Sequence, residues 1–390
     1  MEALTTILYI CACVLLFSLT IAIHEFGHFI VALKLGLKVE AFSIGFGPAL
    51  WKKVHKGVEY RLGAIPFGGY VTLPDVDPEG TRLLEGGKSG AADAGAAIPA
   101  WKELLVALAG PAMNIVLAAV IAVGLAVTPA ARFGELPAVI GAVPPDGPAC
   151  KAGIMAGDTV LSVGGRDVAS WVEMQTEVQI SGGRETIFTV SRPGADGKTP
   201  EKLDLAVTPV RDEITGAYLI MALSVTNATG AAGWMPARNP LKQLAWDAGS
   251  IFRVLKGLVT PREASATAKA IGGPVMIAEG IYVSMRRNPL DGIGFLRFLN
   301  VNLAVLNLLP LPVLDGGLVL FALIAIIFRR RLPRVLVQRL STGFMYLLIA
   351  LMGILLFKDS IRSWKIHTYE PPAQEAAANQ DDPPQPDKNN

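Results

Sequence analysis

The stretch "IAIHEFGHFIVAL", from Ile21 to Leu33, places two histidines and a glutamate inside a run of otherwise apolar residues. A charged side chain at the centre of a bilayer costs roughly 3 kcal/mol or more, so such groups are rarely kept there without a use. His24, Glu25 and His28 form the pattern H-E-x-x-H, whose spacing of four puts both imidazoles on one face of a helix. Histidines so placed can share a zinc ion, and the adjacent glutamate can accept a proton from zinc-bound water. The alternative is a structural histidine pair packed in a helix bundle, with the glutamate hydrogen-bonded to it.

The composition indicates a membrane protein. Of 390 residues, 52% are hydrophobic and only 17% are charged, and the mean hydropathy is +0.44, which is too apolar for an ordinary soluble enzyme. The net charge of +2 is too small to indicate a nucleic-acid partner. Cys11 and Cys13 lie in the first apolar run and Cys150 stands alone, so neither a disulfide framework nor a cysteine-based zinc site is expected.

Four apolar runs are long enough, or nearly long enough, to cross a bilayer, which takes about 20 residues. They are Ile7–Leu33, Leu104–Val127, Phe298–Phe328 and the shorter Leu340–Phe357. The first run lacks the basic segment and the small-residue cleavage pattern of a signal peptide, so we expect it to be retained. The sequence therefore predicts a polytopic α-helical membrane protein with about four transmembrane helices.

Basic residues predict how these spans are oriented. The segment "RRRLPRVLVQR", Arg329 to Arg339, separates the third and fourth runs and should hold that loop in the cytoplasm. Lysines between Lys34 and Lys56, after the first run, agree with this orientation. We therefore expect both termini and the long insert from Ala130 to about Asp291 to be extracytoplasmic.

The insert contains a small strand-rich domain. Residues 137–210 alternate short β-branched runs with Gly and Asp turns around one helical stretch at Ser170–Ile180, and resemble a PDZ domain. Residues 211–292 read as a connector in which Pro240–Val259 has the apolar spacing of a helix lying on the membrane surface. Residues 361–390 are rich in Pro and Asn and are expected to be a disordered tail.

A zinc site needs a third protein ligand. Soluble metzincins would supply a histidine six residues after His28, but Lys34 stands there. The better candidate is Asp315 in the third apolar run, where prolines break the helix and free backbone polar groups that need a cavity or protein partners. Asn307, one turn before the prolines, could donate hydrogen bonds to a substrate carbonyl or oxyanion. Its alternative role is packing between helices, and an Asp-Gly-Gly run taken alone is more often a plain turn.

These motifs together resemble the site-2 family of intramembrane zinc metalloproteases, most closely its bacterial regulator-of-sigma-E (RseP-type) branch. The matching pieces are "HEFGH", "FSIGFGPALW", "EYRLGAIPFGGYV", "AGPAMN" at Ala109–Asn114, and "NLLPLPVLDGG", in family order. The resemblance implies Zn²⁺ bound by His24, His28 and Asp315, with Glu25 catalytic and Asn307 contacting substrate. It also implies an enzyme of the bacterial inner membrane that cleaves single-span membrane proteins, such as anti-sigma factors or remnant signal peptides, after an upstream site-1-type protease. One departure is a single PDZ-like copy where better-known members carry two.

Residues 1–130 would then hold the first two spans, the H-E-x-x-H site and a membrane-associated β region, and residues 293–360 the third and fourth spans. Within the β region, Gly57–Val71 could offer a free strand edge to a substrate, or could be a plain cytoplasmic hairpin. Two other classes remain open, a transporter with broken helices and a scaffold that merely binds partners. The extracytoplasmic domain could either exclude untrimmed substrates or tether trimmed ones.

Overall fold

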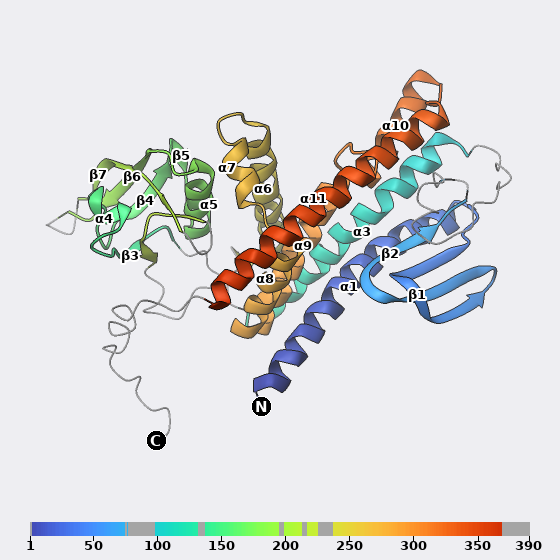
Figure 1. Ribbon diagram of the computed structural model, residues 1–390, viewed down its shortest axis with the longest axis horizontal. Coiled ribbons are helices and arrows are strands. Elements are labelled where there is room, and N and C mark those ends of the chain that lie inside the picture. The colour runs from blue at the N-terminus through green and yellow to red at the C-terminus, as the bar shows by residue number, and fades with distance from the viewer. Residues whose placement is uncertain are drawn as a thin grey trace.

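The computed structural model describes residues 2–74, 76, 98–131, 137–194, 199–212, 217–224 and 237–368. Four of its helices are long and apolar enough to cross a membrane, as the sequence predicts. They are α1 (Glu2–Lys34), α3 (Ala100–Val127), α9 (Pro289–Asn307) and α11 (Arg334–Thr368). Figure 1 shows that the axes of α1, α3 and α11 are roughly parallel, with α9 beside them.

The third apolar run is broken where its prolines lie. Helix α9 ends at Asn307, and α10 (Asp315–Phe328) begins after a loop that contains Pro310 and Pro312. With only 14 residues, α10 is too short to cross a bilayer alone. The predicted break is therefore confirmed, although α9 begins at Pro289, nine residues before the predicted start at Phe298.

Helix α3 is the central helix, since it packs against α1, α9 and α10. Its contact with α1 is very close: a Cβ added at Gly27 would lie 2.4 Å from the carbonyl oxygen of Ala109. Small residues at such a crossing let two membrane helices approach backbone to backbone. The close approach brings α3 against the histidine-bearing face of α1.

The β region is a hairpin that folds back on itself. Strands β1 (Ala41–His55) and β2 (Val58–Thr72) are antiparallel, but Ile44 pairs with both Leu62 and Gly69, and Leu62 pairs with both Ile44 and Trp51. The hairpin thus forms a sheet of four short segments. Segment 65–72 lies at one edge of this sheet and is called the outer segment here, because among the described residues it pairs only with 41–46. Phe29 near the end of α1 packs on Phe42 and Tyr60, fixing the sheet beside that helix.

The strand-rich domain is a separately packed unit. A four-stranded sheet has the order β5-β4-β6-β7, and β10 pairs with β3. These strands are β3 (Ile140–Ala142), β4 (Thr159–Val163), β5 (Arg166–Asp167), β6 (Thr186–Arg192), β7 (Glu201–Val207) and β10 (Leu223–Ser224). The unit also contains the helices α4 (Pro148–Lys151) and α5 (Trp171–Ser181), and the paired strands β8 (Val210–Arg211) and β9 (Tyr218–Leu219). Helix α5 confirms the predicted helix, and Ser170 caps it by accepting from the Glu173 backbone N–H at 3.2 Å. Ile220 is buried in the core, so the unit extends beyond Val210, where the sequence placed its end.

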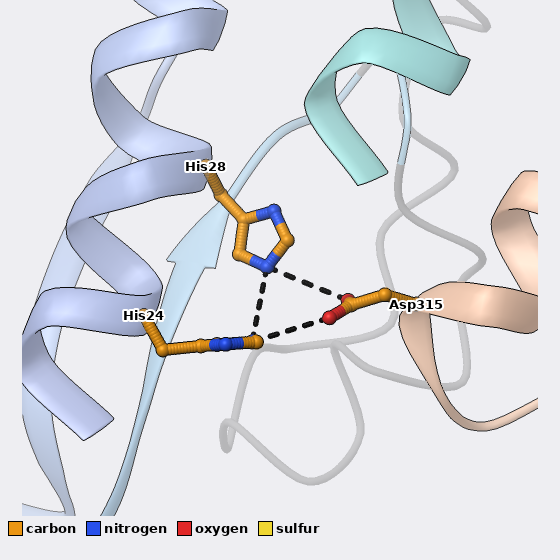
Figure 2. Close-up of side chains that lie close together, drawn as sticks. All are labelled: His24, His28 and Asp315. Carbon is orange, nitrogen blue, oxygen red and sulfur yellow. Dashed lines mark hydrogen bonds and ion pairs between the residues drawn. The ribbon is translucent and has the colours of Figure 1, made fainter. Parts of the chain in front are cut away.

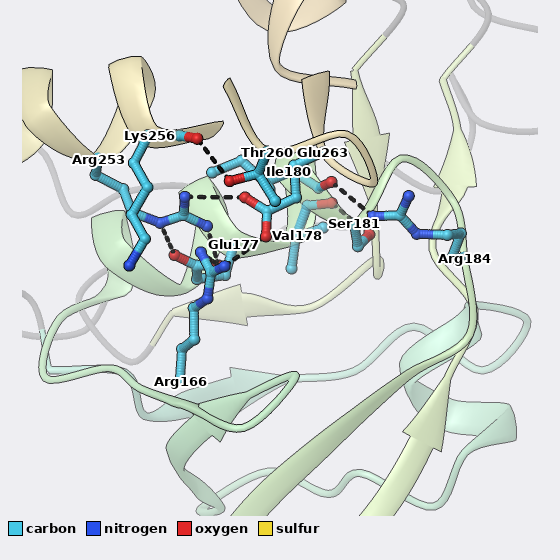
Figure 3. Close-up of polar contacts among 10 residues, drawn as sticks. All are labelled: Arg166, Glu177, Val178, Ile180, Ser181, Arg184, Arg253, Lys256, Thr260 and Glu263. Atoms are coloured by element: carbon cyan, nitrogen blue, oxygen red, sulfur yellow. Dashed lines mark hydrogen bonds and ion pairs between the residues drawn. The ribbon is translucent and has the colours of Figure 1, made fainter. Parts of the chain in front are cut away.

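Helices α6 (Pro240–Val259), α7 (Ala264–Ala270) and α8 (Pro274–Arg287) join this unit to α9. Four charged residues link the strand-rich unit, through its helix α5 and strand β5, to α6 and the start of α7, as Figure 3 shows. Arg253 of α6 donates to both carboxylate oxygens of Glu177 at 2.7 and 2.8 Å and to Glu263 at 3.1 Å, and Arg166 contacts both glutamates. We call this set the charged clasp.

The end of the chain differs in one respect from the expectation. Helix α11 continues to Thr368, so residues 361–368, predicted to belong to a disordered tail, are helical. This end of α11 packs against α8, where Ser363 donates to Glu279 at 2.6 Å, and that contact accounts for the longer helix. The rest of the predicted tail, residues 369–390, lies outside the described residues.

Candidate active site

Helix α1 presents two imidazoles side by side. His24 and His28 are one helical turn apart, their ring centroids are 4.9 Å apart, and the two Nε2 atoms are separated by 3.2 Å. His24 is only 7% exposed. The spacing read from the sequence therefore places two nitrogen ligands close enough to face a common point.

Asp315 meets the histidines from the other side of the site, as Figure 2 shows. Its Oδ2 lies 3.2 Å from His24 Nε2 and its Oδ1 lies 3.4 Å from His28 Nε2. Asp315 is the first residue of α10, where the positive end of the helix dipole stabilises a carboxylate. The helix break thus brings together residues that are nearly 300 positions apart in the sequence.

The glycines after Asp315 explain why this turn can form. A Cβ at Gly316 would lie 2.2 Å from the Leu309 carbonyl oxygen, and one at Gly317 would lie 2.3 Å from that of Leu311. The first turn of α10 therefore packs directly on the backbone of the loop that precedes it. The Asp-Gly-Gly sequence is needed for this close approach, which fixes Asp315 in place.

The three side chains fit a zinc ion. Their ligand atoms lie within 4.8 Å of one another, and the closest separations are 3.2 to 3.4 Å. Tetrahedral coordination with bonds of 2.0–2.1 Å separates neighbouring ligand atoms by about 3.3–3.4 Å. His28 Nδ1 lies 2.7 Å from the Val106 carbonyl oxygen, which can only accept, so His28 carries its proton on Nδ1 and turns a lone pair toward the cluster. A buried carboxylate and a lone pair that converge in this way favour a cation between them.

Helix α3 forms the wall behind the imidazoles, which the sequence did not predict. Besides the Val106 carbonyl, it supplies Asn114, whose Nδ2 is 3.1 Å from His24 Nδ1. A Cβ at Gly110, between them on the helix, would lie 2.3 Å from His28 Nε2. In the sequence these residues belong to or adjoin the "AGPAMN" motif, which was the only signal available for them.

Asn307 and Glu25 also reach the site. Asn307, the last residue of α9, has its Nδ2 3.4 Å from His24 Nε2. Glu25 lines a cavity of about 290 Å³ that also contains His24, His28 and Asp315. The remaining lining residues come from the hairpin and the stretch just after it, the loop after α9, and three helices: Gly69, Tyr70, Val71, Leu73, Val76, Val106, Ala107, Pro312, Val313, Leu314, Leu318, Gln338, Ser341, Thr342 and Met345. All five residues singled out in the sequence therefore lie in one place.

Comparison with known proteins agrees with this geometry. The model described as peptidase family M50 matches residues 12–352. A Clostridium perfringens protein, named provisionally as a zinc metalloprotease, is 32% identical over 359 residues, 91% of this chain and 99% of the relative. A Campylobacter jejuni protein with the same kind of name is 29% identical over 358 residues, 90% of this chain and 93% of the relative.

A plant protein of similar sequence is described as a membrane enzyme. The chloroplastic membrane metalloprotease ARASP of Arabidopsis thaliana is 32% identical over 367 residues, 87% of this chain and 76% of the relative. The apolar helices and these relatives together indicate a multi-pass membrane protein with zinc as its cofactor. Because the family model covers most of the sequence, this chain belongs to peptidase family M50, the site-2 protease family of zinc metalloproteases.

Proposed function

We propose that this protein is an intramembrane zinc endopeptidase that cleaves the transmembrane segments of single-span membrane proteins. The observation that carries the proposal is the meeting of His24 and His28 with Asp315 at a break in a membrane-spanning segment. A cavity with ionisable side chains at such a break gives water and an unwound peptide a place that the surrounding bilayer does not offer. A helical substrate would have to unwind into an extended form there, because a helix shields its peptide bonds.

In the proposed reaction, His24, His28 and Asp315 would hold the zinc ion, which would supply a Lewis acid and lower the pKa of water to about 7. Glu25 accepts a proton from the attacking water and returns it to the leaving amine nitrogen. Asn307 donates a hydrogen bond to the carbonyl oxygen as negative charge develops on it. Its position 3.4 Å from His24 Nε2 supports this role, because a bound carbonyl beside the metal would lie within its reach.

The hairpin is proposed to hold the substrate. Gly69, Tyr70 and Val71 line the cavity and belong to the outer segment 65–72. An extended peptide could pair with the free side of this segment and lie across the site. From the sequence, the substrate-binding edge could lie anywhere in Gly57–Val71. Leu62 already pairs with a neighbouring segment on each side, so only the last residues of this stretch can offer a free edge.

The strand-rich unit is proposed to be a PDZ-type domain on the extracytoplasmic side of a bacterial inner membrane. Its strand order and its capped helix α5 support the domain type. Substrates of the expected kinds, anti-sigma factors and remnant signal peptides, would reach the site after an upstream site-1-type protease had shortened them. The domain would admit the shortened forms and exclude longer ones by its volume.

The decisive experiment compares wild-type protein with Glu25→Gln in liposomes that contain a single-span substrate with a short ectodomain. We expect Glu25→Gln to keep one zinc per chain and to lose cleavage, while the exposed control Glu185→Gln keeps both. Mass spectrometry of the products should place the cut within the substrate's membrane segment. Full cleavage by Glu25→Gln, or a cut outside the membrane segment, would refute the proposal.

A further inference from the structure

The two histidines are held from behind by different kinds of groups on α3. Val106, Gly110 and Asn114 are spaced four apart, so they share one face of the helix, and that face lies against both imidazoles. His28 Nδ1 meets a backbone carbonyl, whereas His24 Nδ1 meets the side-chain amide of Asn114. The orientation of His28 is therefore fixed by the backbone, and that of His24 depends on one replaceable side chain.

We propose that Asn114 is a positioning residue that holds His24 in the tautomer able to bind the metal. This inference rests on the proposed zinc site. His24 can ligate a metal through Nε2 only if its proton resides on Nδ1, and an Nδ1–H needs an acceptor. The structure places the carboxamide of Asn114 beside His24 Nδ1, with its nitrogen 3.1 Å away, and a half-turn would present its oxygen as the acceptor.

The orientation of the amide is coupled to the tautomer of His24. With Nδ2 toward His24, Oδ1 of Asn114 is buried and has no partner among the described residues. That orientation would also put the His24 proton on Nε2, facing Asp315 Oδ2 at 3.2 Å and occupying the metal position. A half-turn of the carboxamide keeps its shape and turns Oδ1 to His24 Nδ1. The two orientations thus correspond to the two tautomers, and the metal-binding tautomer requires the second.

The burial of Asn114 argues against a merely incidental contact with His24. Asn114 is fully buried on a membrane-spanning helix, where an amide without a matching partner is unfavourable. At Gly110 both imidazoles pack directly on the backbone of α3, since a Cβ there would lie 2.3 Å from His28 Nε2. The packing therefore holds His24 against Asn114, so that the amide oxygen sets which ring nitrogen faces the cluster.

The test measures zinc affinity of the purified full-length protein in detergent by competition with a chelator. Asn114→Leu keeps the size of the side chain but removes the acceptor, and is expected to weaken zinc binding about 10- to 100-fold. Asn114→Asp restores an acceptor and should bind zinc at least as tightly as wild type. The matched control is Asn300→Leu, which removes another buried membrane asparagine that bonds Thr20 at 3.2 Å, and it should leave zinc affinity within about twofold.

The outcomes separate this inference from the zinc site itself. If His24→Ala binds zinc as tightly as wild type does, the proposed metal site is wrong. If His24→Ala loses zinc while Asn114→Leu binds it normally, the site stands and the role of Asn114 is refuted. If Asn114→Leu does not fold, Asn114→Asp decides, because a tenfold loss of zinc affinity in that variant would overturn the proposal. Thermal unfolding of the metal-free proteins measures the purely structural effect, which both leucine variants should share.

Discussion

Arg297 of α9 and Asp247 of α6 form a two-point ion pair in which neither side chain is exposed. Arg297 Nε and Nη2 donate to the two carboxylate oxygens at 2.6 and 3.0 Å, and Nη1 donates to Gln243 at 2.6 Å. The pair fixes α6 against the helix that ends in Asn307. A connector that looked from the sequence like a membrane-surface helix is thus joined to the helix leading into the active site.

Removing one member of this ion pair should lower the stability of the protein far more than removing both members. Asp247→Ala leaves a buried arginine without its charge partner and is expected to destabilise the protein by about 3–5 kcal/mol. The double variant Asp247→Leu with Arg297→Met removes both charges and should recover most of that loss. Thermal unfolding in detergent measures the stability of the single and the double variant. Zinc affinity is the control that shows whether the metal site is intact. Equal destabilisation by the single and double variants would contradict this explanation.

The basic segments from which the membrane orientation was predicted lie together in the structure, which leads to a sharper experiment. Arg331, between α10 and α11, donates to Glu103 at the start of α3 at 2.8 Å, and Lys102 donates to the Leu35 carbonyl oxygen at 2.9 Å. The end of α1, the start of α3 and the arginine-rich connection therefore lie at the same end of the bundle. The positive-inside rule places that end in the cytoplasm.

Single cysteines test this orientation in a background from which Cys11, Cys13 and Cys150 have been replaced. Arg330→Cys and Asp167→Cys are both at exposed positions, the first beside Arg331 and the second in the strand-rich unit. A membrane-impermeant thiol reagent should label Asp167→Cys in intact cells and Arg330→Cys only after permeabilisation. The reverse pattern would invert the topology.

The strand edge gives a prediction with a matched control. Successive N–H groups of a strand point to opposite sides, so one of Tyr70 and Val71 directs its N–H toward 41–46 and the other toward the free side. Proline at the residue facing the free side removes one backbone hydrogen bond to substrate and should slow cleavage about tenfold without loss of zinc. Lys53→Pro, in the opposite outer segment, should leave the rate within about twofold. Unchanged cleavage by both Tyr70→Pro and Val71→Pro would count against the edge.

The sequence predicted local features of this site better than its surroundings. The H-E-x-x-H spacing predicted that His24 and His28 share one helix face, and the proline break made Asp315 the better candidate for a third ligand, since both patterns depend on residues close together in the chain. The contact of Asn114 with His24 depends on how α3 is rotated against α1, which no pattern within α3 records. For the same reason Asp247 read as one more polar residue of an amphipathic helix, since its partner lies 50 positions away.

The fold-back of the hairpin was also beyond sequence reasoning. Two β-prone runs predict a hairpin, but pairing of Ile44 with two different segments depends on bends within each strand. The register decides which edge faces the cavity. The structure therefore narrowed the proposed substrate edge from the whole of Gly57–Val71 to its last residues.

The charged clasp allows the strand-rich unit to be tested as a filter without excising it. Exclusion by volume requires that the unit be held near the site, and the clasp joins it to α6, which Arg297 in turn joins to α9. Replacing Arg166 and Arg253 by glutamine leaves Glu177 and Glu263 close together without cations, and should loosen this attachment. Hydrogen exchange in α5 and α7 should rise if the attachment is loosened.

Cleavage of long- and short-ectodomain versions of one substrate then separates the two roles. If the unit is a filter, the Arg166→Gln and Arg253→Gln double variant should cleave the long form faster and the short form at the wild-type rate. If it is a tether, the same variant should slow the short form, because a loosely held unit no longer raises the local concentration of bound substrate. Lys202→Gln, an exposed change on β7 away from the clasp, is the control and should alter neither rate. We expect the filter result, and an unchanged ratio of long to short rates despite faster hydrogen exchange would refute it.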